Sequence, residues 1–345
     1  MSCPFGLGLF LAAVLGIAAQ AQDSLCRPSV SASLEKEARN AMSTREYLLA
    51  ARRFEEAFDA CPDSRSILLG LAQAQVLGRQ FDKAIRTAKQ YLASDWGSVE
   101  GRLILANAYF MAQRLKDALA EAERILRDRP EQPAALKIRG NAAYLLGEFD
   151  KAKDTFIRLL DRYPADEDGA YMLGRIYYQE GYLDLAIGQF DRVLKINPGS
   201  YKALDNLGLC YQALGDADRA MRYFLTAIKL VEKDHPEYEW PYTNVADLLL
   251  KNGDAERAFD AAAKASNRNP MSARSFYIGA KALEQLGKTE LSLNWLLRAV
   301  AVDATSSESW YMLWRVCRKL QLNDKAAEAL QTFRELKAKE PAHRR

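Results

Sequence analysis

Apolar and small residues recur along this chain with a period of 34 residues. The stretches LGRIYYQEGYLDLAIGQF (173–190) and LGLCYQALGDADRAMRYF (207–224) share residues at matching positions at that offset. When Ala186 is numbered position 20 of its repeat, alanine holds position 20 in eight repeats and Ser292 holds it in one. One step is 38 residues long, which places a four-residue insertion near residues 233–237. A fixed period of this size indicates a repeat architecture.

Each repeat predicts two helices. Positions 4, 7, 8 and 11 are apolar or small and lie on one arc of a helix with 3.6 residues per turn. Position 15 is glycine in five repeats, and glycine ends a helix because it adopts the left-handed conformation without steric cost. Positions 20, 24 and 27 resume the helical spacing, and proline at position 32 in five repeats stops the second helix. The sequence therefore predicts an array of helical hairpins.

This pattern resembles the tetratricopeptide repeat family, which has Leu-Gly or Leu-Ala at positions 7–8, Tyr at 11, Ala at 20, Phe at 24 and Pro at 32. The resemblance implies an all-α fold, a right-handed α-solenoid of tandem helix-turn-helix repeats. Two repeats depart from the motif, the first with Glu37 at position 7 and the ninth with Trp314 at position 8, as terminal repeats often do because they cap the stack. Nine repeats fill residues 31–340: 31–64, 65–98, 99–132, 133–166, 167–200, 201–238, 239–272, 273–306 and 307–340.

The composition gives no reason to expect nucleic-acid binding. The chain has 48 basic and 45 acidic residues, a formal charge of +3, and its basic residues are dispersed along the sequence. Apolar residues make up 49% of the chain and charged residues 27%, a balance that excludes a disordered protein. We interpret residues 341–345 as a solvated basic tail.

The N-terminus reads as a signal peptide. Residues 1–22 carry no charged side chain, and FGLGLFLAAVLGIAA (5–19) is apolar apart from its glycines. Ala19-Gln20-Ala21 offers a small-x-small cleavage site, so we expect a leader over 1–21, a mature chain that starts at Gln22 and an N-terminal segment over 22–30. We therefore expect export to the periplasm or beyond the cell. The alternatives are an uncleaved N-terminal membrane anchor and a buried core helix, because the leader lacks Lys and Arg.

The apolar run of the leader is shorter than the ~18 residues that a membrane-spanning helix usually needs. No other apolar run of the sequence approaches that length, so we expect no membrane span in the mature chain.

The five cysteines suggest one disulfide. Cys26 precedes the first predicted helix of repeat one, and Cys61 ends its second helix. Because the two helices of a hairpin run antiparallel, these cysteines lie at the same end of it, and an oxidising compartment would permit a bond. The alternative is a pair of free thiols. Cys210 and Cys317 fit buried small apolar positions, and Cys3 would leave with the leader.

The sequence offers no catalytic or metal-binding motif. The two histidines, His235 and His343, lie in the insertion and the tail, and CxxC, HExxH and GxSxG are absent. ALEQLGKT (282–289) ends like a phosphate-binding loop, but Ala282 stands where that loop needs glycine, and Gly287 is the turn of repeat eight. We therefore expect no enzyme activity, no metal and no cofactor.

The resemblance places a ligand-binding groove on the first helix of each repeat, at positions 2, 5, 9, 12 and 13. Lys137, Asn141 and Lys202 match the Lys, Asn and Lys of the family's carboxylate clamp, while Met172 and Asn206 replace its other two members and Arg175 is a candidate substitute. The alternative is that the aromatic rings pack between adjacent repeats. The predicted groove residues are Asn107, Phe110, Lys137, Asn141, Tyr144, Tyr171, Arg175, Tyr178 and Lys202.

These observations predict a non-catalytic scaffold in the cell envelope that binds a protein or peptide ligand in the concave groove, as part of an envelope assembly complex. The alternative function is carbohydrate binding within an envelope polysaccharide or cell-surface export system, since aromatic grooves suit sugars as well as peptides.

Overall fold

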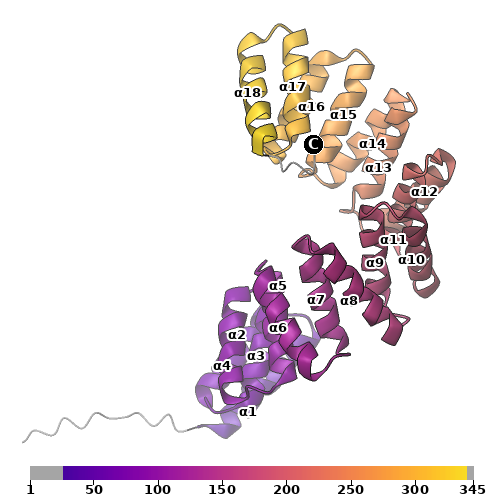
Figure 1. The fold of residues 1–345 in the computed structure, drawn as a ribbon. Coiled ribbons are helices and arrows are strands. Elements are labelled where there is room, and N and C mark those ends of the chain that lie inside the picture. Colours follow the sequence, from indigo (N-terminus) through magenta and orange to yellow (C-terminus); the bar gives the residue numbers. More distant parts are fainter. Residues whose placement is uncertain (1–25, 340–345) are drawn as a thin grey trace, which may run out of the picture. The chain divides into compact units, whose positions relative to one another are not determined.

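The computed structural model describes residues 26–339, and these residues form eighteen helices with no strand among them (Figure 1). The all-α repeat fold expected from the sequence is confirmed. The predicted leader and the basic tail lie outside the described residues. The helices are α1 (Pro28–Ser43), α2 (Tyr47–Ala60), α3 (Arg65–Leu77), α4 (Phe81–Ser94), α5 (Val99–Met111), α6 (Leu115–Asp128), α7 (Pro133–Leu145), α8 (Phe149–Arg162), α9 (Glu167–Gln179), α10 (Leu183–Ile196), α11 (Tyr201–Ala213), α12 (Ala217–Asp234), α13 (Trp240–Lys251), α14 (Ala255–Arg268), α15 (Ala273–Gln285), α16 (Thr289–Val302), α17 (Ser307–Lys319) and α18 (Asn323–Lys339).

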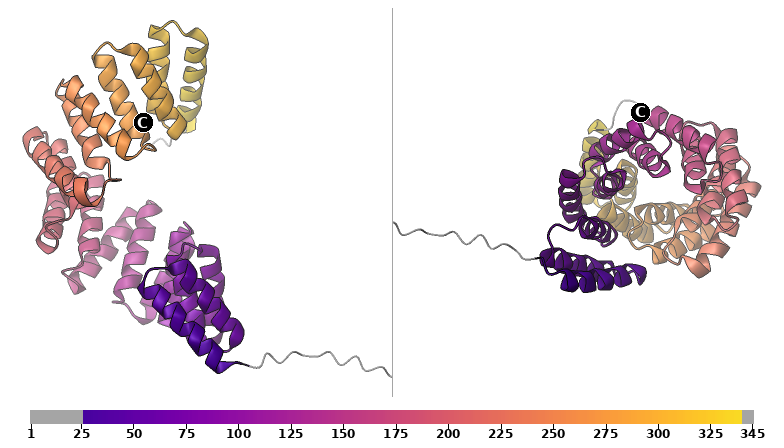
Figure 2. Two further views of the ribbon diagram at one scale, coloured as in Figure 1. Left: turned by 180° about the vertical axis from the view of Figure 1, so that it is seen from behind. Right: turned by 90° about the horizontal axis from the view of Figure 1, so that it is seen from below.

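Each repeat forms one hairpin of two helices. In seven of the nine repeats, the first helix begins at the residue where the repeat begins; α1 starts three residues earlier and α13 one residue later. The chain divides into two compact units, residues 1–121 and 122–345. Within the second unit, the second helix of one repeat packs on the first helix of the next, as α10 does on α11 and α14 on α15 (Figure 2). The core therefore extends from hairpin to hairpin.

In repeats four to six, positions 8 and 24 are complementary in size within a hairpin. Phe156, Phe190 and Phe224 at position 24 are fully buried, and each faces a glycine at position 8. A Cβ atom added at Gly208 would lie 2.4 Å from Cε1 of Phe224, far inside normal contact. Where position 24 is alanine, position 8 is alanine too, as in Ala72 with Ala88 and Ala246 with Ala262. A large ring at position 24 is thus matched by the absence of a side chain at position 8, and two alanines fill the same space where the ring is missing. Both combinations keep the two helices closely packed.

The turn inside every hairpin has a left-handed residue at position 15. The five glycines there have φ between 72° and 84°, as the sequence suggested. Four repeats reach the same conformation without glycine, through Arg45, Arg79, Gln113 and Gln321, with φ between 58° and 64°. A residue with a Cβ atom pays about 1–2 kcal/mol for this conformation. Helix packing rather than residue type therefore imposes the turn in those four repeats.

The insertion in repeat six lengthens α12 to 18 residues, against 14 in α10. The loop that follows folds back onto α11, where the ring of Tyr201 lies 4.4 Å from His235 and 4.7 Å from Tyr238, centroid to centroid. The inserted residues thus cover part of α11 instead of projecting into solvent.

The first hairpin carries a disulfide between Cys26 and Cys61, whose Cα atoms are 4.3 Å apart. Two hydrogen bonds join the same segments, from the Arg27 amide to the Ala60 carbonyl (2.8 Å) and from Ser31 Oγ to the Ala57 carbonyl (2.8 Å). Cys210 and Cys317 are buried free thiols, in line with the expectation for these two positions.

The last described helix, α18, buries fewer residues than the others, and its buried residues are Ala326 and Ala329. Between residues 26 and 339, no helix combines the length and apolar character needed to cross a bilayer.

Candidate ligand-binding surface

The predicted groove residues lie on the first helices of four consecutive repeats. Asn107 and Phe110 belong to α5 in the first compact unit. The other seven lie on α7, α9 and α11 in the second unit, which is described below by itself.

Arg175 is the centre of the group in the second unit. Its Nη2 donates a hydrogen bond to the Tyr144 hydroxyl at 3.2 Å, which joins α9 to α7. Its guanidinium carbon lies 5.0 Å from the ring centroid of Tyr144 and 5.9 Å from that of Tyr171. Cation–π attraction between Arg175 and these rings holds the half-buried side chain in place. The structure therefore brings three of the predicted residues into one cluster.

The two tyrosines of this cluster are shared between the core and the surface. Tyr144 meets Phe149 edge-on at 5.6 Å, and Tyr171 lies 5.9 Å from Phe190. The Tyr171 hydroxyl also accepts a hydrogen bond from Asn206 of the next repeat at 3.2 Å. Burial raises the pKa of Tyr171. The rings thus pack within their own hairpins, while their hydroxyl groups bond to the next repeat, and each ring stays half-buried.

The residues that match the carboxylate clamp are differently placed. Lys137 forms ion pairs with Asp166 at 3.3 Å and Asp168 at 3.2 Å. Burial lowers the pKa of Lys137, but its interactions with these two carboxylates outweigh burial and raise the pKa overall. Lys202 is exposed on α11, with its ammonium 5.9 Å from the ring of Tyr201. A carboxylate ligand at Lys137 would have to displace two acidic partners.

Two further polar contacts continue the row of first helices and were missed by the sequence analysis. Asn244 of α13 donates to Asp205 of α11 at 2.9 Å, and Gln212 of α11 donates to Asp247 of α13 at 3.0 Å. Asp205, Gln212 and Asp247 occupy positions 5, 12 and 9, so the positional rule would have found them in repeats six and seven. Asn244 is at position 6, for which that rule gives no signal.

Asp205 makes stability depend on pH. Burial raises the pKa of Asp205 to about 7 from an ordinary value of 3.8, with Asn244 lowering it and Glu239 raising it. Between these two values the folded state holds a proton that the unfolded state has lost, so stability decreases as pH rises from about 4 to about 7. We expect Asp205→Asn to flatten this dependence in urea unfolding curves recorded across that range. An unchanged pH profile in the variant would show that Asp205 ionises normally.

Two adjoining pockets lie on the first helices further along the second unit, with volumes of about 390 and 620 Å³. Both are lined by Tyr277 and Lys281 of α15, and they are bounded by α13 on one side and α17 on the other. Tyr277 and Tyr311 occupy position 5 of repeats eight and nine, but the predicted groove did not include them.

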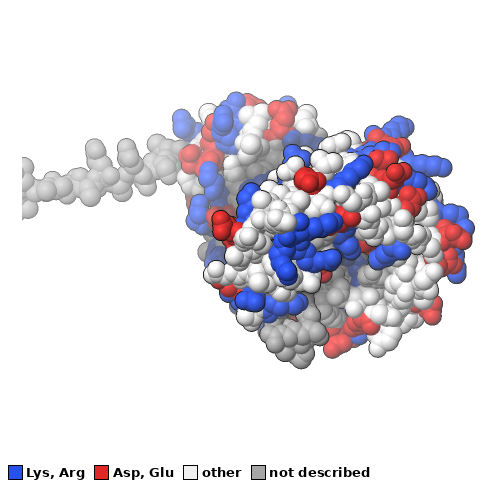
Figure 3. Space-filling model, turned by 90° about the horizontal axis from the view of Figure 1, so that it is seen from above, with Lys and Arg blue, Asp and Glu red and all other residues white. Residues whose placement is uncertain are grey.

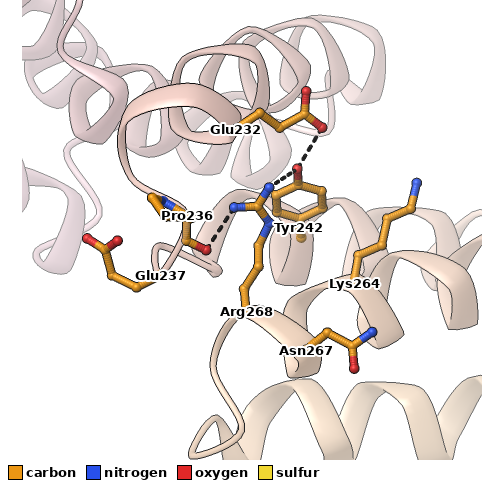
Figure 4. A pocket seen from close by; sticks show the side chains of 7 residues that line it. All are labelled: Glu232, Pro236, Glu237, Tyr242, Lys264, Asn267 and Arg268. Carbon is orange, nitrogen blue, oxygen red and sulfur yellow. Dashed lines mark hydrogen bonds between the residues drawn. The ribbon is translucent and has the colours of Figure 1, made fainter.

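A third pocket, of about 610 Å³, is formed by the insertion (Figure 4). Arg268 of α14 reaches across it and donates to the Pro236 carbonyl and to the Tyr242 hydroxyl, both at 2.9 Å. Tyr242 in turn donates to Glu232 at 2.9 Å. These polar groups form hydrogen bonds with one another, and the bond from Arg268 to the Pro236 carbonyl joins the inserted loop to α14. In the described part of the chain, no cluster of His, Cys, Asp and Glu side chains has the arrangement of a metal site.

Comparison with known proteins supports the repeat assignment. One family model, described as a tetratricopeptide repeat, matches residues 35–99, 78–133, 103–167, 139–201 and 246–309. A second model of the same description matches residues 199–271. These matches cover more than half of the chain. No curated protein sequence matches it significantly.

The chain is also similar to solved structures. A tetratricopeptide repeat protein from Parabacteroides merdae matches with a TM-score of 0.60 and 16% identity, over 74% of this chain and 99% of that one. Cut9–Hcn1, a hetero-tetramer of the APC/C, matches with a TM-score of 0.62 and 14% identity, over 82% of this chain and 55% of the other. MamA matches with 28% identity and a TM-score of 0.45, over 49% of this chain and 92% of its own. The first two likenesses show the fold alone.

Proposed function

Because the chain belongs to the tetratricopeptide repeat family, whose repeats form protein interaction scaffolds, we propose that it binds an extended segment of a partner protein along the first helices of its second compact unit. The observation that carries this proposal is a row of aromatic and polar side chains from consecutive first helices, joined by the hydrogen bonds of Arg175 with Tyr144, Asn206 with Tyr171 and Gln212 with Asp247.

This row has the properties of a binding hot spot. Tyrosine and arginine are enriched at the centre of protein interfaces because they offer large contact area together with hydrogen-bonding groups. Arg175 is already held by two rings, so a ligand would not have to immobilise a free side chain. Amide and carboxylate groups beside the rings, at Asn206, Gln212 and Asp247, can pair with the backbone of an extended peptide.

The cluster can be tested by cross-linking within cells. A photoreactive benzoylphenylalanine at Leu145, an exposed residue at position 13 of α7, should capture a discrete protein partner. The same group at Leu225, comparably exposed on the second helix α12, should capture none. Arg175→Ala should reduce capture at position 145 about tenfold or more, as hot-spot truncations of ~2 kcal/mol do.

Two results would argue against the proposed groove. One is equal capture from positions 145 and 225, and the other is a partner that binds Arg175→Ala as well as the parent protein. Retention of the purified parent protein on a glycan array, without any cross-linked protein, would favour the carbohydrate-binding alternative.

We further propose that the scaffold works in the cell envelope. The support is the leader-like sequence over residues 1–21 and the Cys26–Cys61 disulfide, because such bonds persist in oxidising compartments. Mass spectrometry of the native protein should find a mature chain that starts at Gln22. A chain that keeps Met1 and fractionates with the cytosol would contradict export.

A further inference from the structure

We propose that the two adjoining pockets on α13, α15 and α17 bind a segment of the partner protein that carries acidic side chains. This inference rests on the proposed function, since it treats these pockets as a second contact of the same partner, and it adds the chemistry of the segment and the place where it binds.

The two pockets meet at one residue pair. Tyr277 and Lys281 line both of them, one turn apart on α15, with the Lys281 ammonium 5.6 Å from the Tyr277 ring centroid. The Tyr277 hydroxyl interacts electrostatically with Glu308, Arg274 and Asp247 on the side of the smaller pocket and with Arg315 on the side of the larger one. On the side of the larger pocket, the half-buried ring thus faces two cations, Lys281 and Arg315, while the acidic residues that interact with it line the smaller pocket.

Not all of the cations that line the two pockets form an ion pair with an acidic residue. Lys251 is paired with Asp247 at 2.7 Å, and Lys319 is paired with Glu284 at 3.3 Å. Among the described residues, no ion pair is formed by Arg274, Lys281 or Arg315, the remaining cations that line the pockets. Figure 3 shows charged groups of both signs scattered over one face of the molecule.

The smaller pocket carries as many acidic as basic residues, with Asp247, Asp303 and Glu308 against Lys251, Arg274 and Lys281. Asp303 accepts hydrogen bonds from the backbone amide and the hydroxyl of Thr305, at 2.9 and 2.6 Å, and so closes the turn before α17. In the larger pocket, the one acidic residue is Glu284, against Lys281, Arg315 and Lys319. The larger pocket is thus net positive, and an acidic ligand complements it.

Glu284 adds a second requirement. Its Oε2 accepts from Lys319, whereas its Oε1 is buried and has no hydrogen-bond partner. A buried acceptor without a donor is costly, and a ligand N–H would remove that cost. Met312 and Val316 supply apolar surface in the same pocket. A peptide meets all three demands at once, with a carboxylate for the cations, a backbone N–H for Glu284 and an apolar side chain for Met312 and Val316.

The test uses the mature chain and a defined probe, a short fluorescein-labelled peptide in which glutamate alternates with leucine and glycine, followed by fluorescence anisotropy. We expect Lys281→Gln combined with Arg315→Gln to weaken binding about tenfold or more, because hydrogen bonds to charged groups contribute strongly. The matched control is Arg222→Gln combined with Lys229→Gln, which removes two exposed cations from α12 and should leave affinity unchanged. Binding of the parent should also weaken as salt is raised.

Three results would overturn the inference. They are equal binding of the probe by the Lys281/Arg315 variant and the parent, equal binding of a probe with glutamine in place of glutamate, and displacement by alginate at lower concentration than by the unlabelled peptide. Cross-linking at Leu145 separates this failure from that of the proposed function. If a partner is captured at Leu145 but the acidic probe binds the Lys281/Arg315 variant as well as the parent, the proposed scaffold function stands and only the acidic site is refuted.

Discussion

Phe224→Ala should lower the free energy of unfolding of the second compact unit by about 3–5 kcal/mol, the usual cost of removing a fully buried phenylalanine ring. The ring is completely buried in a cluster with Ala220, Val245 and Ala258, and it faces Gly208 across the hairpin. Urea unfolding followed by circular dichroism would measure the loss. Leu225→Ala on the same helix is a suitable control, because that side chain is 45% exposed and its removal should cost far less.

A second substitution, at Gly208, tests whether positions 8 and 24 are packed as a pair. Gly208→Ala alone should destabilise the protein by about 1–3 kcal/mol, because its Cβ atom would lie 2.4 Å from the Phe224 ring. In the Phe224→Ala background that ring is gone, and the Ala–Ala pair reproduces what Ala246 and Ala262 form in repeat seven. The two changes should therefore be strongly coupled, with the double variant more stable than the sum of the single losses predicts. Additive losses would show that positions 8 and 24 are not packed as a pair.

Cys61→Ser should destabilise the first hairpin by roughly 3–4 kcal/mol, the amount expected when a cross-link that closes a loop of this length is removed. The Cys26–Cys61 bond spans a sequence separation of 35 residues, and it ties together the first hairpin of the described residues. Hydrogen exchange should show faster exchange in α1 and α2 of the variant, with protection in α9–α16 unchanged.

Reductant provides the internal control for this experiment. It should accelerate exchange of α1 and α2 in the parent protein and have no further effect on Cys61→Ser. Identical exchange of the parent with and without reductant would mean that the bond does not constrain the hairpin.

The repeat spacing was sufficient to predict the hairpins, because it specifies where each helix begins and which residues face its partner. It could not predict the four left-handed turns at Arg45, Arg79, Gln113 and Gln321 from residue type, since packing of the helices on either side imposes them. The pairing of glycine at position 8 with phenylalanine at position 24 was visible in the sequence, but its meaning depends on distances that only the structure supplies.

The candidate site, too, was predictable from the sequence only in part. Tyr144, Tyr171 and Arg175 meet because positions 12, 5 and 9 of neighbouring repeats fall on adjacent helix faces, the face where the resemblance to the repeat family placed the groove. The ion pairs of Lys137 and the burial of Asp205 depend on residues that do not recur from repeat to repeat. The positive pocket beside Tyr277 lies on the predicted positions too, but its charge follows from which cations find acidic partners, and that required side-chain geometry.

Because α18 buries few residues, we expect unfolding of the array to begin at that helix. In a stack of hairpins, each repeat is held by its immediate neighbours, so loss of structure starts at whichever end is weaker and travels inward. At one end a covalent bond joins the two sides of the first hairpin, while at the other α18 has Ala326 and Ala329 as its buried residues. Heating or mechanical tension would therefore release the C-terminal helix first, next to the pockets of α15 and α17. Proteases would find their earliest cleavage sites there.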